Sequence, residues 1–209
     1  TTEIPGAIAP LLDLSRKPIP AQDANTVVFY SISNTQAGLA GVSFGHFLIK
    51  QVAEDLKKDL PNLKTFVTLS PVPGFAKWLR SEREKEDGLI DAGLRRALAV
   101  LDREGYAQDP ALADTVRKAV MPAAALYFLK ARNAAGRPVD AVARFHLGNG
   151  ARLERLNPLG DLSEKGLRQS HGLMVNYCYD LDDIEENHEA FAEKGTVAAS
   201  RAVQRALRA

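Results

Sequence analysis

The sequence predicts an α/β domain, and two observations point to that fold class. The first is a strand, a helix and a second strand in succession, at about 26–32, 42–59 and 64–69. A helix between two strands allows them to lie parallel, which a short turn cannot do. The second is a long helical stretch over 75–136, followed by further segments with strand character. Strands and helices in this order are expected to form one sheet with helices packed against it.

The N-terminal elements follow from side-chain type and spacing. Residues 8–14 predict a short helix with a proline in its first turn, where proline is tolerated. The segment 26–32 is rich in β-branched and aromatic residues and predicts a buried strand. The helix at 42–59 repeats apolar residues at every fourth position, and Pro61 ends it before the strand at 64–69. The two strands are therefore expected to pair in parallel.

The middle of the chain predicts helices followed by a β-hairpin. The helices over 75–136 are interrupted by glycine and proline near residues 88, 105 and 110. Strands are predicted at 141–145 and 152–156, because Asn149 and Gly150 between them are a strong hairpin signal. This interpretation places a histidine directly after the first strand of the hairpin.

One more strand and a charged helix complete the chain. The strand is predicted at 174–180, where Tyr177 and Tyr179 share a face because alternate residues point the same way. Core packing is the expected role of both rings. The tail over 181–209 predicts a single helix with small or apolar residues at every fourth position, namely Ala199, Val203 and Leu207.

Composition narrows the class of protein. The 209 residues are 45% hydrophobic and 25% charged, which is typical of a soluble globular domain. Lys and Arg total 27 against 26 Asp and Glu, so the formal net charge is only +1. A nucleic-acid partner, which would favour a basic protein, is therefore not expected. No uncharged apolar run approaches the ~18 residues of a membrane helix.

Cys178 is the only cysteine, which favours a reducing, intracellular setting. The start, without Met, is interpreted as internal or processed.

A glycine-rich turn joins the first strand to the following helix. It contains Gln36, Gly38 and Gly41, and such glycines let consecutive N–H groups approach an anion at a helix N-terminus. A pyrophosphate suits this position, and close helix–sheet packing is the alternative reason for the glycines. The spacing fits neither the P-loop nor the dinucleotide fingerprint, which argues against ATP and NAD. The turn resembles the coenzyme A loop of the GNAT acyltransferase superfamily.

Ser70 and His146 are the candidate catalytic residues. Ser70 directly follows the strand at 64–69, and the two prolines and the glycine after it make the backbone rigid. A fixed hydroxyl at a strand end suits a residue that holds a substrate group, whereas a plain Ser-Pro turn is the alternative. His146 can serve as an acid or base near neutral pH, and a structural, hydrogen-bonded histidine is its alternative.

Two other kinds of site are weighed against this pair. A Ser-His-acid hydrolase would place its serine in a GxSxG turn, but Ser70 lies in Leu-Ser-Pro and no acidic partner stands out. A metal site would need ligands at characteristic spacings, and no two histidines have such an interval. Neither a hydrolase nor a metal is therefore favoured.

Five stretches taken together resemble malonyl-CoA decarboxylases in order and approximate spacing. They are 29–41, 47–50, 69–75, 145–151 and 172–177. Several matches in one order are more specific than any single loop. The resemblance implies a GNAT-like mixed sheet with flanking helices, a helical insertion at about 75–136, and one catalytic domain over 1–209.

The resemblance also implies the site residues. Ser70 and His146 fall on the catalytic serine and histidine of the family, and Ser31 and Tyr179 fall on further active-site positions. The coenzyme A moiety of malonyl-CoA is implied to bind a loop of seven consecutive residues: Ala40, Gly41, Val42, Ser43, Phe44, Gly45 and His46.

The implied reaction converts malonyl-CoA to acetyl-CoA and carbon dioxide in fatty-acid and malonate metabolism. Loss of carbon dioxide leaves an enolate that must be stabilised and then protonated. The thioester is itself the electron sink, so no cofactor is expected. We expect Ser70 to hold the malonyl group by hydrogen bonding and His146 to deliver the proton. The loop at 40–46 would position the reacting end through the pyrophosphate.

Two departures from the family matter. Its members carry an N-terminal helical domain that builds tetramers, and the first strands of the sheet, neither of which is visible here. A homo-oligomer is still expected, through a region missing from this chain. The tail lacks the Ser-Lys-Leu type of peroxisomal address, so the bacterial cytoplasm is the expected location. A GNAT-type acetyltransferase and a non-catalytic acyl-CoA-binding fragment remain the alternative functions.

Overall fold

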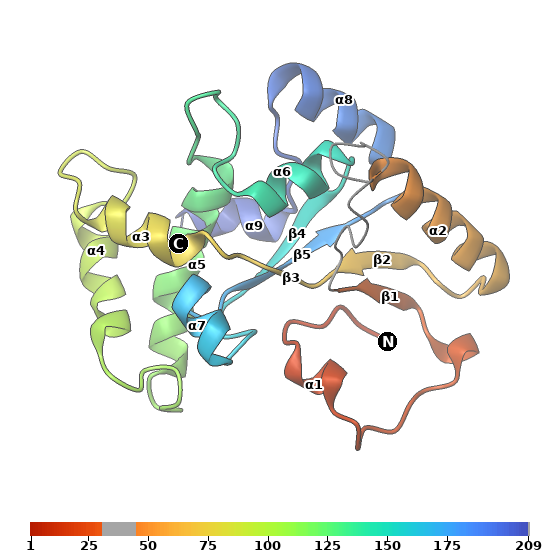
Figure 1. The fold of residues 1–209 in the computed structure, drawn as a ribbon, viewed down its shortest axis with the longest axis horizontal. Helices are drawn as coiled ribbons and strands as arrows, with labels where there is room; N and C mark the ends of the chain where they lie inside the picture. Colours follow the sequence, from red (N-terminus) through yellow and green to blue (C-terminus); the bar gives the residue numbers. More distant parts are fainter. Residues whose placement is uncertain (31–44, 209) are drawn as a thin grey trace, which may run out of the picture.

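The computed structural model describes residues 1–30 and 45–208. Within them the chain forms a mixed five-stranded sheet with helices around it, which confirms the α/β class (Figure 1). The strands are β1 (Thr26–Phe29), β2 (Thr65–Thr68), β3 (Ser70–Pro71), β4 (Arg152–Asn157) and β5 (Met174–Cys178). The α-helices are α1 (Ala9–Leu12), α2 (Gly45–Asp59), α3 (Phe75–Arg83), α4 (Ala92–Ala97), α5 (Ala113–Leu129), α6 (Ala141–Gly148), α7 (Glu164–Ser170), α8 (Ile184–Lys194) and α9 (Arg201–Arg205). Short 3₁₀ segments are η1 (Ala21–Asp23), η3 (Leu98–Asp102) and η4 (Ala206–Arg208).

Strand β5 is the centre of the sheet. It is antiparallel to β2 and β3 along one edge and to β4 along the other, and its five side chains are all buried. Strand β1 pairs with β2 in parallel, with Thr26 opposite Thr65, and α2 lies between the two strands in the chain. The parallel pair predicted from the strand–helix–strand order is therefore confirmed.

The predicted hairpin at 141–156 is wrong in its first half. Residues 141–148 form helix α6, whose first turn is capped by Asp140: the carboxylate accepts a hydrogen bond of 2.7 Å from the Ala143 N–H. The buried positions Ala143, His146 and Leu147 have helical spacing, and that signal outweighs the hairpin dipeptide. Strand β4 forms as predicted, but its partner is β5.

The turn after α6 explains why its sequence resembles a hairpin. Gly150 has a φ of +79°, a conformation that favours glycine. A side chain there would collide with the carbonyl of Ile184, the first residue of α8. Gly150 therefore lies in a turn between helix α6 and strand β4, packed against α8. The sequence had predicted a turn between two strands at this position.

The tail does not form one helix. Helix α8 ends at Gly195, which has a φ of 64°, and the chain then runs extended beside β4. The Leu153 N–H donates to the Ala198 carbonyl, and the Ser200 N–H donates to the Leu153 carbonyl. Ser200 then caps the separate helix α9. Ala199 is thus part of a strand-like bridge, so the helix predicted over 181–209 is wrong at its centre.

The helical stretch over 75–136 forms as predicted, with α3, α4 and α5 gathered at the end of the sheet away from α2 (Figure 1). Its interior is aromatic: the Phe75 and Tyr127 rings meet edge to face with centroids 5.5 Å apart, and Phe128 packs against Tyr127. Such contacts stabilise by roughly 0.5–1.5 kcal/mol beyond the area that they bury. This cluster packs α3 against α5.

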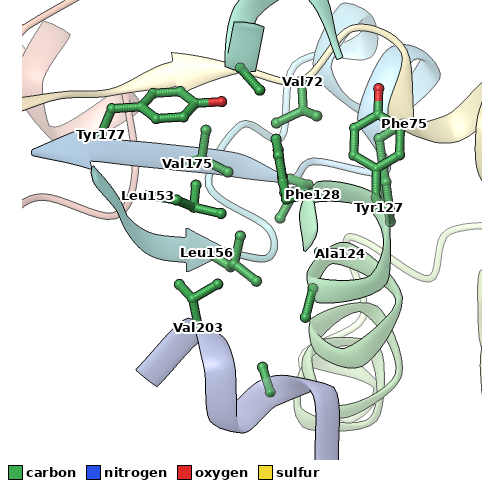
Figure 2. Packing of buried hydrophobic residues seen from close by; sticks show 14 of the residues in the cluster. Val72, Phe75, Ala124, Tyr127, Phe128, Leu153, Leu156, Val175, Tyr177 and Val203 are labelled. Carbon is green, nitrogen blue, oxygen red and sulfur yellow. The ribbon is translucent and has the colours of Figure 1, made fainter. Parts of the chain in front are cut away.

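The main core lies between β4, β5 and the helices beside them. Figure 2 shows Leu153 and Leu156 of β4 beside Val175 of β5, with Val203 of α9 on the far side of β4. All four side chains are buried. Within the described ranges, no helix is long and apolar enough to span a membrane.

Candidate active site

Ser70 is the first residue of β3. It lies directly after β2 in the chain, and both strands pair with β5. Its side chain is buried, with an exposed fraction of 5%. Ser70 Oγ is hydrogen-bonded to Thr68 Oγ1 at 2.9 Å and lies 3.3 Å from Nε2 of His146. The serine and histidine are separated by 76 positions in the chain, and the fold brings them into hydrogen-bonding contact.

His146 reaches this point from helix α6. The cap residue Asp140 fixes the start of the helix and also accepts a hydrogen bond of 3.0 Å from the buried Tyr127 hydroxyl. The imidazole itself is buried, and the Tyr177 ring stacks on it with centroids 4.5 Å apart. A ring held by stacking and by bonds at both nitrogens has a fixed orientation.

Tyr179 occupies the other side of the imidazole. Its hydroxyl oxygen lies 2.7 Å from Nδ1 of His146. Tyr179 directly follows β5. Its main-chain N–H donates to the Phe66 carbonyl of β2, and this bond holds the backbone of Tyr179 against the sheet. Burial raises the pKa of the Tyr179 hydroxyl, so it keeps its proton at neutral pH.

Four polar groups form one buried chain of hydrogen bonds, which runs from Tyr179 through His146 and Ser70 to Thr68. Each hydroxyl can donate one hydrogen bond and accept others, and a neutral imidazole donates at one nitrogen and accepts at the other. The ring hydrogen of His146 therefore lies either on Nε2, facing Ser70, or on Nδ1, facing Tyr179.

The imidazole in this chain is neutral. Burial lowers the pKa of His146 to about 3, because the protonated ring would lose its hydration without gaining a carboxylate partner. No acidic side chain among the described residues hydrogen-bonds it. The site therefore lacks the third member of a Ser-His-acid triad.

The buried, neutral histidine predicts a pH-dependent stability. Its pKa is about 3 in the folded protein and near 6.5 when unfolded, so the unfolded chain binds the extra proton below pH 6.5. The free energy of unfolding should fall as the pH drops, by about 2 kcal/mol between pH 6.5 and pH 5. Urea unfolding at both pH values, with the wild type beside His146→Asn, measures this. An equal decline in both proteins would contradict the prediction.

The whole chain, residues 1–209, matches the sequence family described as the malonyl-CoA decarboxylase C-terminal domain. The chain belongs to this family. It is 62% identical to malonyl-CoA decarboxylase from Rhodopseudomonas palustris, with a TM-score of 0.92 over 99% of this chain and 47% of that one. For the enzyme from Agrobacterium vitis the identity is 59% and the TM-score 0.92, over 99% and 51% of the two chains.

A more distant relative gives the same family. The mitochondrial malonyl-CoA decarboxylase of Anser anser anser is 36% identical over 202 residues, which are 88% of this chain and 40% of that protein. The chain thus spans about two fifths of this curated relative and about half of the solved malonyl-CoA decarboxylases.

Three of the residues that the resemblance to malonyl-CoA decarboxylases implied lie in contact. Ser70 and Tyr179 bond opposite nitrogens of His146. The expectation that His146 follows a strand was wrong, since it lies in helix α6.

The other residues that the resemblance implied lie outside the described residues or at the start of α2. Ser31 and the loop residues 40–44 lie outside the described residues. Gly45 and His46 form the start of helix α2. Across 1–30 and 45–208, no group of three His, Cys, Asp or Glu side chains is placed to hold a metal ion.

Sequence reasoning missed Thr68 and Asp140. Thr68 lies two positions before Ser70, and its hydroxyl forms the end of the chain of hydrogen bonds. Nothing in the strand pattern distinguishes that hydroxyl from an ordinary strand threonine. Asp140 did carry a signal, because an aspartate just before apolar positions with helical spacing is a helix N-cap.

Proposed function

We propose that this chain is the catalytic part of a malonyl-CoA decarboxylase, which converts malonyl-CoA to acetyl-CoA and carbon dioxide. The observation that carries the proposal is the buried contact of 3.3 Å between Ser70 Oγ and the neutral His146 ring in a member of this family. A neutral ring N–H beside a fixed hydroxyl suits a reaction that needs one held group and one proton.

The reaction has two chemical steps. The bond between the malonyl carboxylate carbon and the α-carbon breaks, and its electron pair becomes the enolate of the thioester while carbon dioxide leaves. The α-carbon then takes a proton and gives acetyl-CoA. Because the thioester carbonyl accepts the electrons, the residues need only hold the malonyl group, favour the enolate and supply the proton.

We assign these tasks by position. Ser70 hydrogen-bonds the malonyl group, and the N–H at Nε2 of His146 gives its proton to the enolate carbon. Because the ring is neutral, the proton lost at Nε2 is replaced at Nδ1 by the Tyr179 hydroxyl, 2.7 Å away. Before the next turnover a proton from solvent restores the N–H at Nε2 and Nδ1 returns its proton to Tyr179, so the net reaction consumes one proton for each carbon dioxide released.

The remaining parts of the proposal concern the fold around this site. We propose a GNAT-like sheet in a single domain over 1–209, with 75–136 as its helical insertion. The parallel pair β1 and β2, connected through α2, supports this layout. Residues 40–46, the last two of which begin α2, would bind the coenzyme A moiety through their N–H groups, and Ser31 would take part at the reacting group.

The assembly and location are also proposals. We propose a homo-oligomer, which light scattering on the purified protein would test. A bacterial cytoplasmic location is supported by the bacterial source of the two similar solved proteins.

Product analysis separates the candidate functions. The purified chain is expected to release acetyl-CoA and carbon dioxide from malonyl-CoA in equal amounts. Transfer of an acetyl group from acetyl-CoA to amines without carbon dioxide release would instead favour an acetyltransferase. Calorimetric binding of malonyl-CoA with no turnover would favour an acyl-CoA-binding fragment, and either result would contradict the proposal.

A further inference from the structure

The pairing of β5 with β2 and β3 is interrupted directly before Ser70, although one register runs through both strand pairs. The Tyr179 N–H donates to the Phe66 carbonyl. In an antiparallel pair the next such bond falls two residues along each strand, so it would join the Tyr177 N–H to the Thr68 carbonyl. The Tyr177 N–H instead donates to the Thr68 hydroxyl oxygen at 3.2 Å, which leaves the Thr68 carbonyl without its usual partner in the ladder.

The side chain of Asn176 bonds this carbonyl. Its amide nitrogen donates to the Thr68 carbonyl at 2.8 Å and to the Pro5 carbonyl at 3.0 Å. Neither Asn176 nor Thr68 has exposed surface. Because main-chain carbonyls only accept hydrogen bonds, these two contacts identify the nitrogen of the amide and fix the direction of both bonds. A side chain of β5 thus satisfies the buried carbonyl at the break.

The amide oxygen of Asn176 is also held in place. It accepts a hydrogen bond of 2.8 Å from Asn157 Nδ2, and Asn157 Oδ1 accepts one of 2.8 Å from Arg155 Nε. The guanidinium of Arg155 also donates to the Ile4 carbonyl at 2.7 Å. Because a guanidinium only donates, every bond in this network runs from Arg155 through the two asparagines to the main-chain carbonyls. Asn176 therefore has partners on both sides of its amide and one orientation.

Asn176 and Ser70 lie on opposite faces of the sheet. Ser70 pairs with Val175, so these two side chains share the face on which Ser70 meets His146. Asn176 is the next residue of β5 and points to the other face, because alternate residues of a strand face opposite ways. Thr68 connects the two faces: its carbonyl bonds Asn176, and its hydroxyl oxygen lies 2.9 Å from Ser70 Oγ.

We propose that Asn176 is a positioning residue, which holds the break open and so places Ser70 from the opposite face of the sheet. While Asn176 bonds the Thr68 carbonyl, the Tyr177 N–H stays on the Thr68 hydroxyl oxygen, which is in contact with Ser70. Without the amide, the buried carbonyl needs another donor, and its regular partner is the Tyr177 N–H. The break would then close, and Ser70 would move relative to His146.

The first test is structural and uses Asn176→Ala. In a crystal structure of the variant we expect the Tyr177 N–H to bond the Thr68 carbonyl. We also expect the distance between Ser70 Oγ and His146 Nε2, which is 3.3 Å in the wild type, to exceed about 3.5 Å. Asn176→Ser serves where Ala prevents folding, because its hydroxyl oxygen stands one bond closer to the main chain than the amide nitrogen and does not replace it.

Turnover gives a second readout, which rests on the proposed decarboxylase function. Asn176→Ala should lower kcat/KM for malonyl-CoA by about tenfold, the size of effect expected from one lost buried hydrogen bond. In a Ser70→Ala background the same substitution should change kcat/KM by less than about twofold, because a residue that acts through Ser70 then has nothing to place. A side chain needed only for folding would have the same effect in both backgrounds.

Ser170→Ala is the matched control. It removes a buried hydroxyl that hydrogen-bonds two main-chain carbonyls, as the Asn176 amide does, but it lies in α7, outside the chain of hydrogen bonds around His146. The variant should have a lower melting temperature, while its kcat/KM stays within about twofold of the wild type.

Two results would overturn the inference. One is a folded Asn176→Ala variant in which the break and the position of Ser70 are unchanged. The other is an equal loss of kcat/KM in the presence and absence of the Ser70 hydroxyl. The crystallographic comparison does not depend on which reaction the protein catalyses. A wild type without decarboxylase activity therefore refutes the proposed function, while the structures still decide the role of Asn176.

Discussion

Replacing His146 by Asn is expected to lower the turnover of malonyl-CoA by about 10²–10⁴-fold, the range typical of a lost general acid. The amide of Asn has no acidic proton to give to the enolate carbon, and it cannot reach both Ser70 and Tyr179 as the imidazole does. Binding of the coenzyme A moiety should change little, because its proposed contacts lie in the loop at 40–46. Steady-state kinetics with calorimetric binding of malonyl-CoA separates the two effects.

The control is the same substitution at a half-buried histidine away from this cluster. His171→Asn removes a hydrogen bond of 2.9 Å to Tyr106, and Asn tolerates the left-handed φ of 52° at that position. Turnover should stay within about threefold of the wild type in this variant. If His146→Asn lost binding and turnover to the same degree, the role as proton donor would be wrong, and a role in binding would replace it.

The structure also shows which features the sequence could predict. The parallel β1–β2 pair, the helices over 75–136 and strand β5 follow from local periodicity, because each is regular over its own length. The hairpin failed where two local signals competed. Asn149 and Gly150 indicated a turn between strands, while Asp140 and the spacing of 143, 146 and 147 indicated a helix, and the helix is what forms.

The site could be predicted only through its resemblance to a family. Periodicity does not bring Ser70 to His146 across 76 positions, and the resemblance implied that both are catalytic. Thr68 shows what neither route supplies. Its hydroxyl accepts from the Tyr177 N–H at a break in the pairing with β5, and such a break arises from the packing of the whole sheet.

Replacing Ser70 by Ala should produce the second large effect, a loss of about 10²–10³-fold in kcat/KM for malonyl-CoA, comparable to the loss of one preorganised hydrogen-bonding group. The hydroxyl holds the malonyl group in the proposed mechanism, so the loss should appear partly in binding. Malonyl-CoA should bind more weakly, whereas acetyl-CoA, which lacks the carboxylate, should bind as in the wild type. Competition between the two ligands, measured by calorimetry, tests this difference.

The Ser70→Ala variant also distinguishes holding from nucleophilic attack. If Ser70 only holds the substrate, the variant still has the neutral His146 and Tyr179, and slow release of carbon dioxide should persist above the uncatalysed rate. If Ser70 formed a covalent acyl intermediate, the variant would lose that route entirely, and mass spectrometry of the wild type under turnover would show an added malonyl or acetyl group. We expect no such adduct, because in the proposed mechanism Nε2 of His146 carries the proton that goes to the enolate carbon and so cannot accept the Ser70 proton.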